Sequence, residues 1–145
     1  MMSWDDYGLT LAETVARKSK DPSTKCGCIV LDEQHRWTGA AGYNGFPRGV
    51  PDDADKLKDR NTKLNLVIHA EENALLFARQ DLRGGTAYVW PMPPCSRCAA
   101  KLAQVGIVRV VTRAPSDEQR ERWGESFALA QWVYEQAGIE YIEHE

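Results

Sequence analysis

Two short stretches of the sequence constrain the fold more than any other feature, because each places metal-ligand residue types at the start of an apolar helical pattern. The first stretch is His69-Ala70-Glu71, and the second is Pro94-Cys95-Ser96-Arg97-Cys98. One imidazole and two thiolates supply three ligands of the kind that zinc prefers, which leaves the fourth tetrahedral position open. The fold must therefore bring two helix starts together, and the open position indicates a catalytic metal site rather than a structural one.

Glu71 follows the histidine by two residues, which makes its carboxylate the candidate general base. A zinc ion held by two thiolates and a neutral imidazole is formally neutral, so it activates water less strongly than a zinc ion held by three imidazoles. A nearby base must help to remove the water's proton, and Glu71 can then return that proton to the substrate. Cys95 and Cys98 lie three residues apart on one predicted helix, so their sulfur atoms face the same way.

The composition predicts one globular domain over residues 1–145. The net charge is −3 and no long basic run occurs, which argues against a dedicated nucleic-acid binder. No apolar run reaches membrane-spanning length, and the acidic N-terminus does not resemble a secretory signal, so we expect a cytoplasmic protein with no membrane partner. We expect Cys26 and Cys28 to be small core or interface residues, on opposite faces of a strand.

Hydrophobic periodicity predicts helices and strands in the order α-β-β-α-β-α-β-α-β. The first two strands form an antiparallel hairpin, and the later strand–helix–strand units imply a largely parallel sheet covered on both faces. The charged residues from 51 to 63 predict a solvated loop or a flap, the least ordered part of the chain. The apolar run from Ala74 to Ala78 predicts that the second helix is buried all round. The predicted helices span 3–18, 69–80, 95–105 and 116–138, and the predicted strands span 25–31, 37–43, 86–90, 107–112 and 139–143.

Three further stretches make the chain resemble the cytidine/deoxycytidylate deaminase superfamily over nearly its whole length. They are Ser19-Lys20-Asp21-Pro22-Ser23-Thr24-Lys25, Gly42-Tyr43-Asn44-Gly45-Phe46-Pro47 and His69-Ala70-Glu71-Glu72-Asn73-Ala74-Leu75. The pattern His-x-Glu followed by Pro-Cys-x-x-Cys is the signature of zinc nucleobase deaminases. Within the superfamily, the chain is most similar to the deoxycytidylate (dCMP) deaminases. The resemblance implies a three-layer α/β/α fold of the cytidine-deaminase type, with a five-stranded mixed sheet and an N-terminal antiparallel hairpin.

The resemblance also implies an activity, which is the zinc-dependent hydrolysis of dCMP to dUMP and ammonia in pyrimidine deoxynucleotide metabolism. It implies one Zn²⁺ per chain, with Glu71 as the proton carrier and with three ligands: His69, Cys95 and Cys98. It further implies three substrate contacts: the side chain of Asn44 on the sugar hydroxyl, and the backbone at Ala70 and Pro93 around the base.

Other residues are candidate contacts because they lie next to the motifs or the site-forming loops in the sequence. Trp90 adjoins the second motif and is a candidate substrate contact. Lys20, Lys25 and Arg48 border the site-forming loops and are candidate phosphate ligands. Family members are commonly hexamers that dCTP activates and dTTP inhibits, so the resemblance implies a homo-oligomer and a triphosphate effector bound with Mg²⁺. Gly45 and Phe77 are the candidate effector contacts.

Several alternatives remain open at this point. The segment Trp90-Pro91-Met92-Pro93 is bulkier than its counterpart in the family, which suits a 5-substituted dCMP; cytidine or a free base are further alternatives. Deamination of a base in tRNA or single-stranded DNA is a more distant alternative, because phosphate neutralisation dominates such binding and no basic groove is evident. A catalytically dead zinc module is the non-enzymatic alternative. The intact Glu71 argues against it, because such a module needs only the ligands.

Overall fold

The computed structural model describes the whole chain, residues 1–145. Six helices and five strands follow one another as α1 (Trp4–Ala16), β1 (Gly27–Leu31), β2 (Trp37–Tyr43), α2 (Ala54–Lys58), α3 (Arg60–Leu66), α4 (Ala70–Phe77), β3 (Thr86–Trp90), α5 (Ser96–Val105), β4 (Arg109–Thr112), α6 (Asp117–Ala137) and β5 (Glu140–Glu143). None of the helices is both long and apolar enough to cross a membrane.

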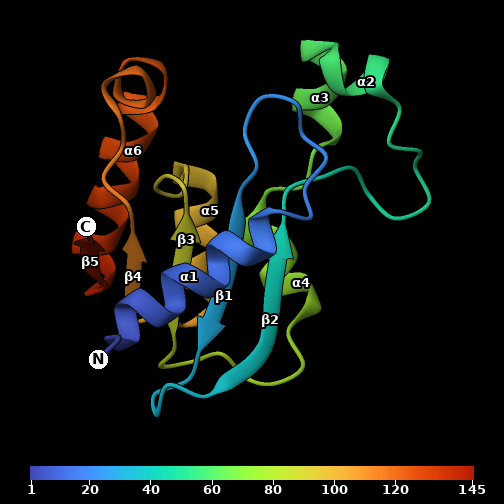
Figure 1. Cartoon of the computed structure of the whole chain (residues 1–145). Coiled ribbons are helices and arrows are strands. Elements are labelled where there is room, and N and C mark those ends of the chain that lie inside the picture. The colour runs from blue at the N-terminus through green and yellow to red at the C-terminus, as the bar shows by residue number, and fades with distance from the viewer.

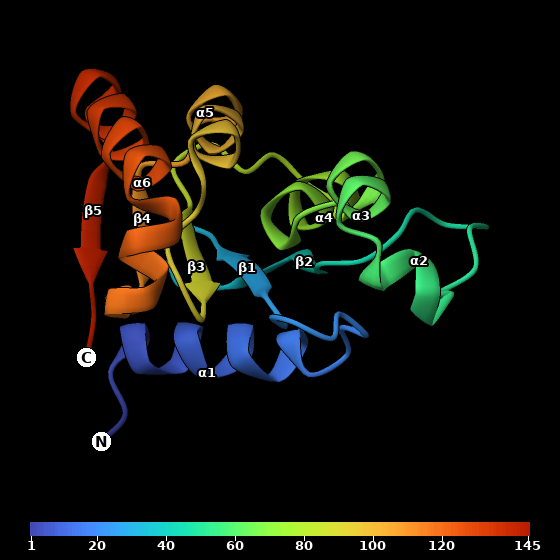
Figure 2. The same cartoon turned by 90° about the horizontal axis from the view of Figure 1, so that it is seen from above.

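The five strands form one mixed sheet in the order β2-β1-β3-β4-β5 (Figure 1). Strand β1 pairs antiparallel with both β2 and β3, whereas β3, β4 and β5 run parallel to one another. Figure 2 shows α1 along one face of the sheet and α4, α5 and α6 on the other side. The predicted three-layer α/β/α fold, with its mixed sheet and its N-terminal hairpin, is therefore confirmed.

Local sequence signals explain where the helices begin and end. The Ser3 hydroxyl accepts a hydrogen bond from the Asp6 backbone N–H and caps α1, and Ser116 and Gln119 form a reciprocal capping box at the start of α6. Gly106 has a φ of 96° in the left-handed region, which ends α5. These caps confirm the predicted helix ends within one or two residues.

Side chains along each strand point alternately to the two faces of the sheet, so the core is divided into two clusters. On β3, the side chains of Ala87 and Val89 join the larger cluster under α4, α5 and α6, whereas Tyr88 packs with the smaller cluster under α1. Trp90 also packs against the α1 cluster. Alternation therefore sends Trp90 to the face opposite Val89.

Three expectations about local structure are wrong. The charged segment 51–63 folds into the short helices α2 and α3, because Leu57 turns inward and is only 6% exposed. Helix α4 is not buried all round: Ala70 and Ala74 face the sheet, but Leu76 and Phe77 are 69% and 49% exposed. Cys26, just before β1, and Cys28 lie on the same face, because residues two positions apart in an extended chain point the same way. Cys28 is fully buried, and Cys26 packs against the same core cluster.

The close approach of α4 to β2 depends on Gly42. A β-carbon at this position would lie 2.6 Å from the carbonyl oxygen of Ala70 and closer still to the backbone nitrogen of Ala74. Backbone atoms of a packed helix cannot move aside as the end of a side chain can, so any larger residue must push the two elements apart. Gly42 therefore fixes the height of α4 above the sheet.

We expect Gly42→Ala to destabilise the protein by about 2 kcal/mol or more, because it overpacks a backbone contact. The melting temperature should fall by roughly 4–8 °C in a calorimetric scan. Gly124→Ala is the matched control, since nothing lies within 4 Å of a β-carbon there and the site is inside α6. That control should melt with the parent protein or above it. A Gly42→Ala protein that melts with the parent would contradict the close contact.

Candidate metal centre and active site

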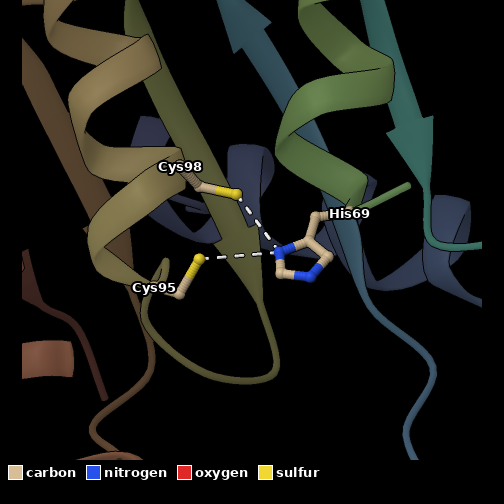
Figure 3. Close-up of side chains that lie close together, drawn as sticks. All are labelled: His69, Cys95 and Cys98. Atoms are coloured by element: carbon tan, nitrogen blue, oxygen red, sulfur yellow. Dashed lines mark hydrogen bonds between the residues drawn. The ribbon is translucent and has the colours of Figure 1, made fainter. Parts of the chain in front are cut away.

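Three side chains from two helix starts meet at one point (Figure 3). The Nδ1 atom of His69 lies 3.5 Å from the Cys95 sulfur and 3.3 Å from the Cys98 sulfur, and the three donor atoms all lie within 4.8 Å of one another. A tetrahedral zinc ion with ordinary bond lengths separates a nitrogen ligand from a sulfur ligand by about 3.5 Å. The spacing and the chemistry of the donor set therefore fit a zinc ion with one open position.

The local fold explains this convergence. His69 is the N-cap of α4 and Cys95 is the N-cap of α5, so the positive ends of two helix dipoles point at the same place. Cys98 lies in the first turn of α5, beside Cys95. Glu72 ties the two helices together, because it accepts a 2.9 Å hydrogen bond from the His69 backbone N–H and forms an ion pair with Lys101 of α5. The ligands are thus held by main-chain geometry and by a carboxylate that spans both helices.

Pairing and burial shift the pKa values in this cluster. The hydrogen bond with the Cys98 thiol is the largest influence on Cys95 and, together with His69, it lowers the pKa of Cys95 to about 4. The same pairing, together with burial, raises the pKa of Cys98. The hydrogen bond with Cys95 raises the pKa of His69. The cluster therefore already stabilises one thiolate, and a cation placed among the donors favours loss of the second thiol proton.

Glu71 lies next to these donors and is only 6% exposed. Burial raises the pKa of its carboxyl group to about 7, because the charged form loses its hydration. A carboxyl group with a pKa near neutrality exchanges protons readily in both directions, which is what a proton carrier requires.

A cavity of about 420 Å³ opens beside the cluster. It brings together six residues that were predicted from the sequence, namely Asn44, His69, Ala70, Glu71, Pro93 and Cys95. Its wall also includes residues that the sequence analysis did not assign to the site, among them Asp21, Lys58, Arg60, Lys63, Arg122, Trp123 and Phe127. Lys58 comes from α2, Arg60 and Lys63 come from α3, and the last three residues come from α6.

The remaining predicted contacts lie outside the cavity wall. Trp90 faces α1, Lys20 and Arg48 are exposed, and Lys20 forms an ion pair with Asp52. Gly45 forms an isolated bridge with Ile68, and Phe77 lies on the exposed side of α4.

The cations of the cavity were missed because each lies in a segment that looks solvated. Two signals were available: Leu57 and Leu64 recur at helical spacing inside the charged run, and Trp123 and Phe127 lie four residues apart on α6.

Three potential zinc ligands beside a buried carboxylate, next to a cavity, are the arrangement found in hydrolytic metalloenzyme sites. The chain belongs to the family described as the cytidine and deoxycytidylate deaminase zinc-binding region, whose model matches residues 2–114. It is 40% identical over 137 residues to an uncharacterised deaminase of Aliivibrio fischeri, a match that covers 94% of this chain and 90% of that protein.

One further relative supports the family, and one solved structure supports the fold. The deoxycytidylate deaminase of Mus musculus is 32% identical over 148 residues, which cover 97% of this chain and 79% of the mouse protein. The crystal structure of dCMP deaminase from the cyanophage S-TIM5, in complex with dCMP and dUMP, superposes with a TM-score of 0.75. At 24% identity, this superposition covers 99% of this chain and all of the phage chain, and it supports the fold.

We expect the purified protein to contain about one zinc ion per chain, because only three ligands converge on one point. Cys98→Ser and His69→Ala should each reduce the zinc content sharply, as measured by inductively coupled plasma mass spectrometry. Cys28→Ala removes a buried thiol outside the cluster and should retain the metal. A zinc content of one ion per chain in the Cys98→Ser protein would show that the metal binds outside this cluster.

Proposed function

We propose that this protein catalyses the zinc-dependent hydrolytic deamination of dCMP to dUMP and ammonia. The observation that carries the proposal is the buried Glu71 carboxyl group beside the His69, Cys95 and Cys98 cluster, in a cavity that also contains Asn44 and several cations. Relatives named deoxycytidylate deaminase, at 30% identity or more over most of this chain, support the choice of substrate.

Three parts of the site have separate tasks in the proposed reaction. His69, Cys95 and Cys98 would hold the zinc ion, which would supply Lewis-acid activation of the water that attacks C4 of the ring. The Glu71 carboxylate takes a proton from that water and gives it to N3 of the ring. A second proton transfer through Glu71 reaches the amino group on C4, which then leaves as ammonia. The cavity wall, which includes Trp123 and Phe127, excludes bulk water from these transfers.

The cations of the cavity support a phosphorylated substrate. Lys58, Arg60 and Arg122 all line the cavity, and none of them takes part in a salt bridge. Free cations that converge on one cavity, in a chain whose net charge is negative, favour an anionic ligand. We propose that they bind the 5′-phosphate, in place of the exposed Lys20 and Arg48.

The resemblance alone supports three finer expectations. These are a hexameric assembly, control by dCTP and dTTP with Mg²⁺, and effector contacts at Gly45 and Phe77. Deamination of a 5-substituted dCMP also remains an alternative, because the cavity is partly walled by the apolar side chains of Met92, Trp123 and Phe127.

We expect Glu71→Gln to lower kcat for dCMP by about 10²- to 10⁴-fold, because it removes the proton carrier but keeps the shape of the side chain. Ammonia release measures the rate, and metal analysis should show that zinc is retained. Glu125→Gln is the control, since it neutralises an exposed carboxylate of α6 that takes part in no salt bridge and does not line the cavity. Full activity in the Glu71→Gln protein would refute the proposed mechanism.

We expect Arg122→Met to lower kcat/KM for dCMP by about 10- to 100-fold, the usual worth of a hydrogen bond to a charged group. The same change should leave deoxycytidine, which has no phosphate, unaffected. Lys20→Met provides the comparison, because it removes one of the cations that the sequence analysis offered as phosphate ligands. A loss in the Lys20→Met protein, with none in the Arg122→Met protein, would restore the sequence-based assignment of the phosphate contact.

A further inference from the structure

The side-chain amide of Asn44 is held by hydrogen bonds on both sides. Its Oδ1 accepts a 2.8 Å hydrogen bond from the Cys26 backbone N–H. Its Nδ2 donates to the Thr24 carbonyl oxygen at 2.9 Å and to Asp21 Oδ2 at 3.4 Å. Because the Cys26 N–H can only donate, the oxygen of the amide must face β1 and the nitrogen must face the Asp21 turn.

This arrangement limits what Asn44 can offer to a ligand. An amide group has two N–H donors and two oxygen lone pairs, and both donors and one lone pair are already used. Asn44 is only 8% exposed and lines the cavity, so the remaining lone pair of Oδ1 is its one free polar group there. Asn44 can therefore accept a hydrogen bond from a ligand hydroxyl, but it cannot donate one.

Asp21 connects this amide to the helices over the cavity. Its Oδ1 accepts hydrogen bonds from the backbone N–H groups of Ser23 and Thr24, and from Lys63 Nζ at 2.9 Å. The side chain of Asp21 is 3% exposed and that of Lys63 is 21% exposed, so this ion pair is largely removed from water. Lys63 belongs to α3, which is separated from Asp21 by 42 residues of sequence.

The ion pair between Lys63 and Asp21 affects the Asn44 amide. A buried carboxylate that loses its cation is strongly disfavoured, so without Lys63 the Asp21 side chain is held less firmly, by two backbone N–H groups and the Asn44 amide. The Cys26 N–H and the Thr24 carbonyl orient the Asn44 amide, and Asp21 Oδ2 is the further acceptor through which Lys63 acts on it. The position of α3 is thereby linked to the orientation of an amide in the cavity wall.

We propose that Lys63 is a positioning residue that makes recognition of the sugar hydroxyl depend on the placement of α3, through Asp21 and Asn44. This inference rests on the proposed function, since dCMP has a single free sugar hydroxyl, on C3′. That hydroxyl donates to the free lone pair of Asn44 Oδ1. A substrate with a hydrogen or a fluorine at C3′ lacks the donor and gains nothing from this amide.

The test compares Lys63→Met with Lys58→Met, two lysines that line the same cavity and come from the same pair of helices. Each protein is assayed for ammonia release from dCMP, from 2′,3′-dideoxycytidine 5′-monophosphate and from the 3′-fluoro analogue. A neutral hydrogen bond corresponds to about a 2- to 10-fold preference, so the parent protein should favour dCMP over both analogues by that factor in kcat/KM. In Lys63→Met this preference should disappear, and Lys63→Arg should restore it.

Lys58→Met should instead reduce the rates for all three substrates in the same proportion, because it removes a charge that acts on their common phosphate. An equal reduction in Lys63→Met would overturn the inference, since a general electrostatic or structural role does not distinguish a hydroxyl from hydrogen. A parent protein that favours the 3′-fluoro analogue as strongly as dCMP would overturn it as well.

A second measurement separates this inference from the proposed function. If the parent protein releases no ammonia from dCMP, the proposed function fails, and the side-chain amide signals of Asn44 in a nuclear magnetic resonance spectrum decide the structural link. In the parent protein, the Nδ2 hydrogens of Asn44 should exchange with solvent more slowly than those of the exposed Asn61. They should lose this protection in Lys63→Met. Unchanged protection would overturn the link between α3 and the amide.

Discussion

The meeting of two helix N-termini at one point is the constraint on which the rest of the site depends. Helices α4 and α5 come from different parts of the chain, and each places a metal-ligand side chain at its cap. Gly42 lets α4 lie close to the sheet, and Glu72 joins the start of α4 to Lys101 of α5. Because the thiols, the imidazole and the two helix dipoles act together, the cluster favours one thiolate, at Cys95, before any metal is considered.

The cavity beside this cluster combines two kinds of chemistry. Burial raises the pKa of the Glu71 carboxyl group to about 7, a value suited to proton transfer. Arg60 of α3 and Arg122 of α6 also line the cavity, and neither takes part in a salt bridge. In the proposed function, the base of the nucleotide would lie at the carboxyl group and its phosphate would lie at the cations.

The sequence predicted the site residues whose spacing marks them as metal ligands or as a proton carrier. It missed the residues that only the packing of distant segments brings to the cavity. His69, Glu71 and the two cysteines of α5 are close in sequence to helix starts, so their convergence followed from local rules. Trp90 is adjacent to the motif in sequence, but strand alternation turns it toward α1. Arg122 lies far along the chain, on a helix whose polar face looks solvated from the sequence, and only the packing of α6 brings it to the cavity.

Helices α2 and α3 pack chiefly against each other and stand at one corner of the molecule, apart from the sheet (Figure 1). They nevertheless supply three cations to the cavity: Lys58 from α2, and Arg60 and Lys63 from α3. The metal-ligand cluster thus lies in the layers packed on the sheet, whereas these cations come from a helix pair at the edge of the fold. In the proposed function, this pair would carry part of the binding of the substrate's phosphate, so a change in its sequence would alter the choice of substrate without touching the ligands of the metal.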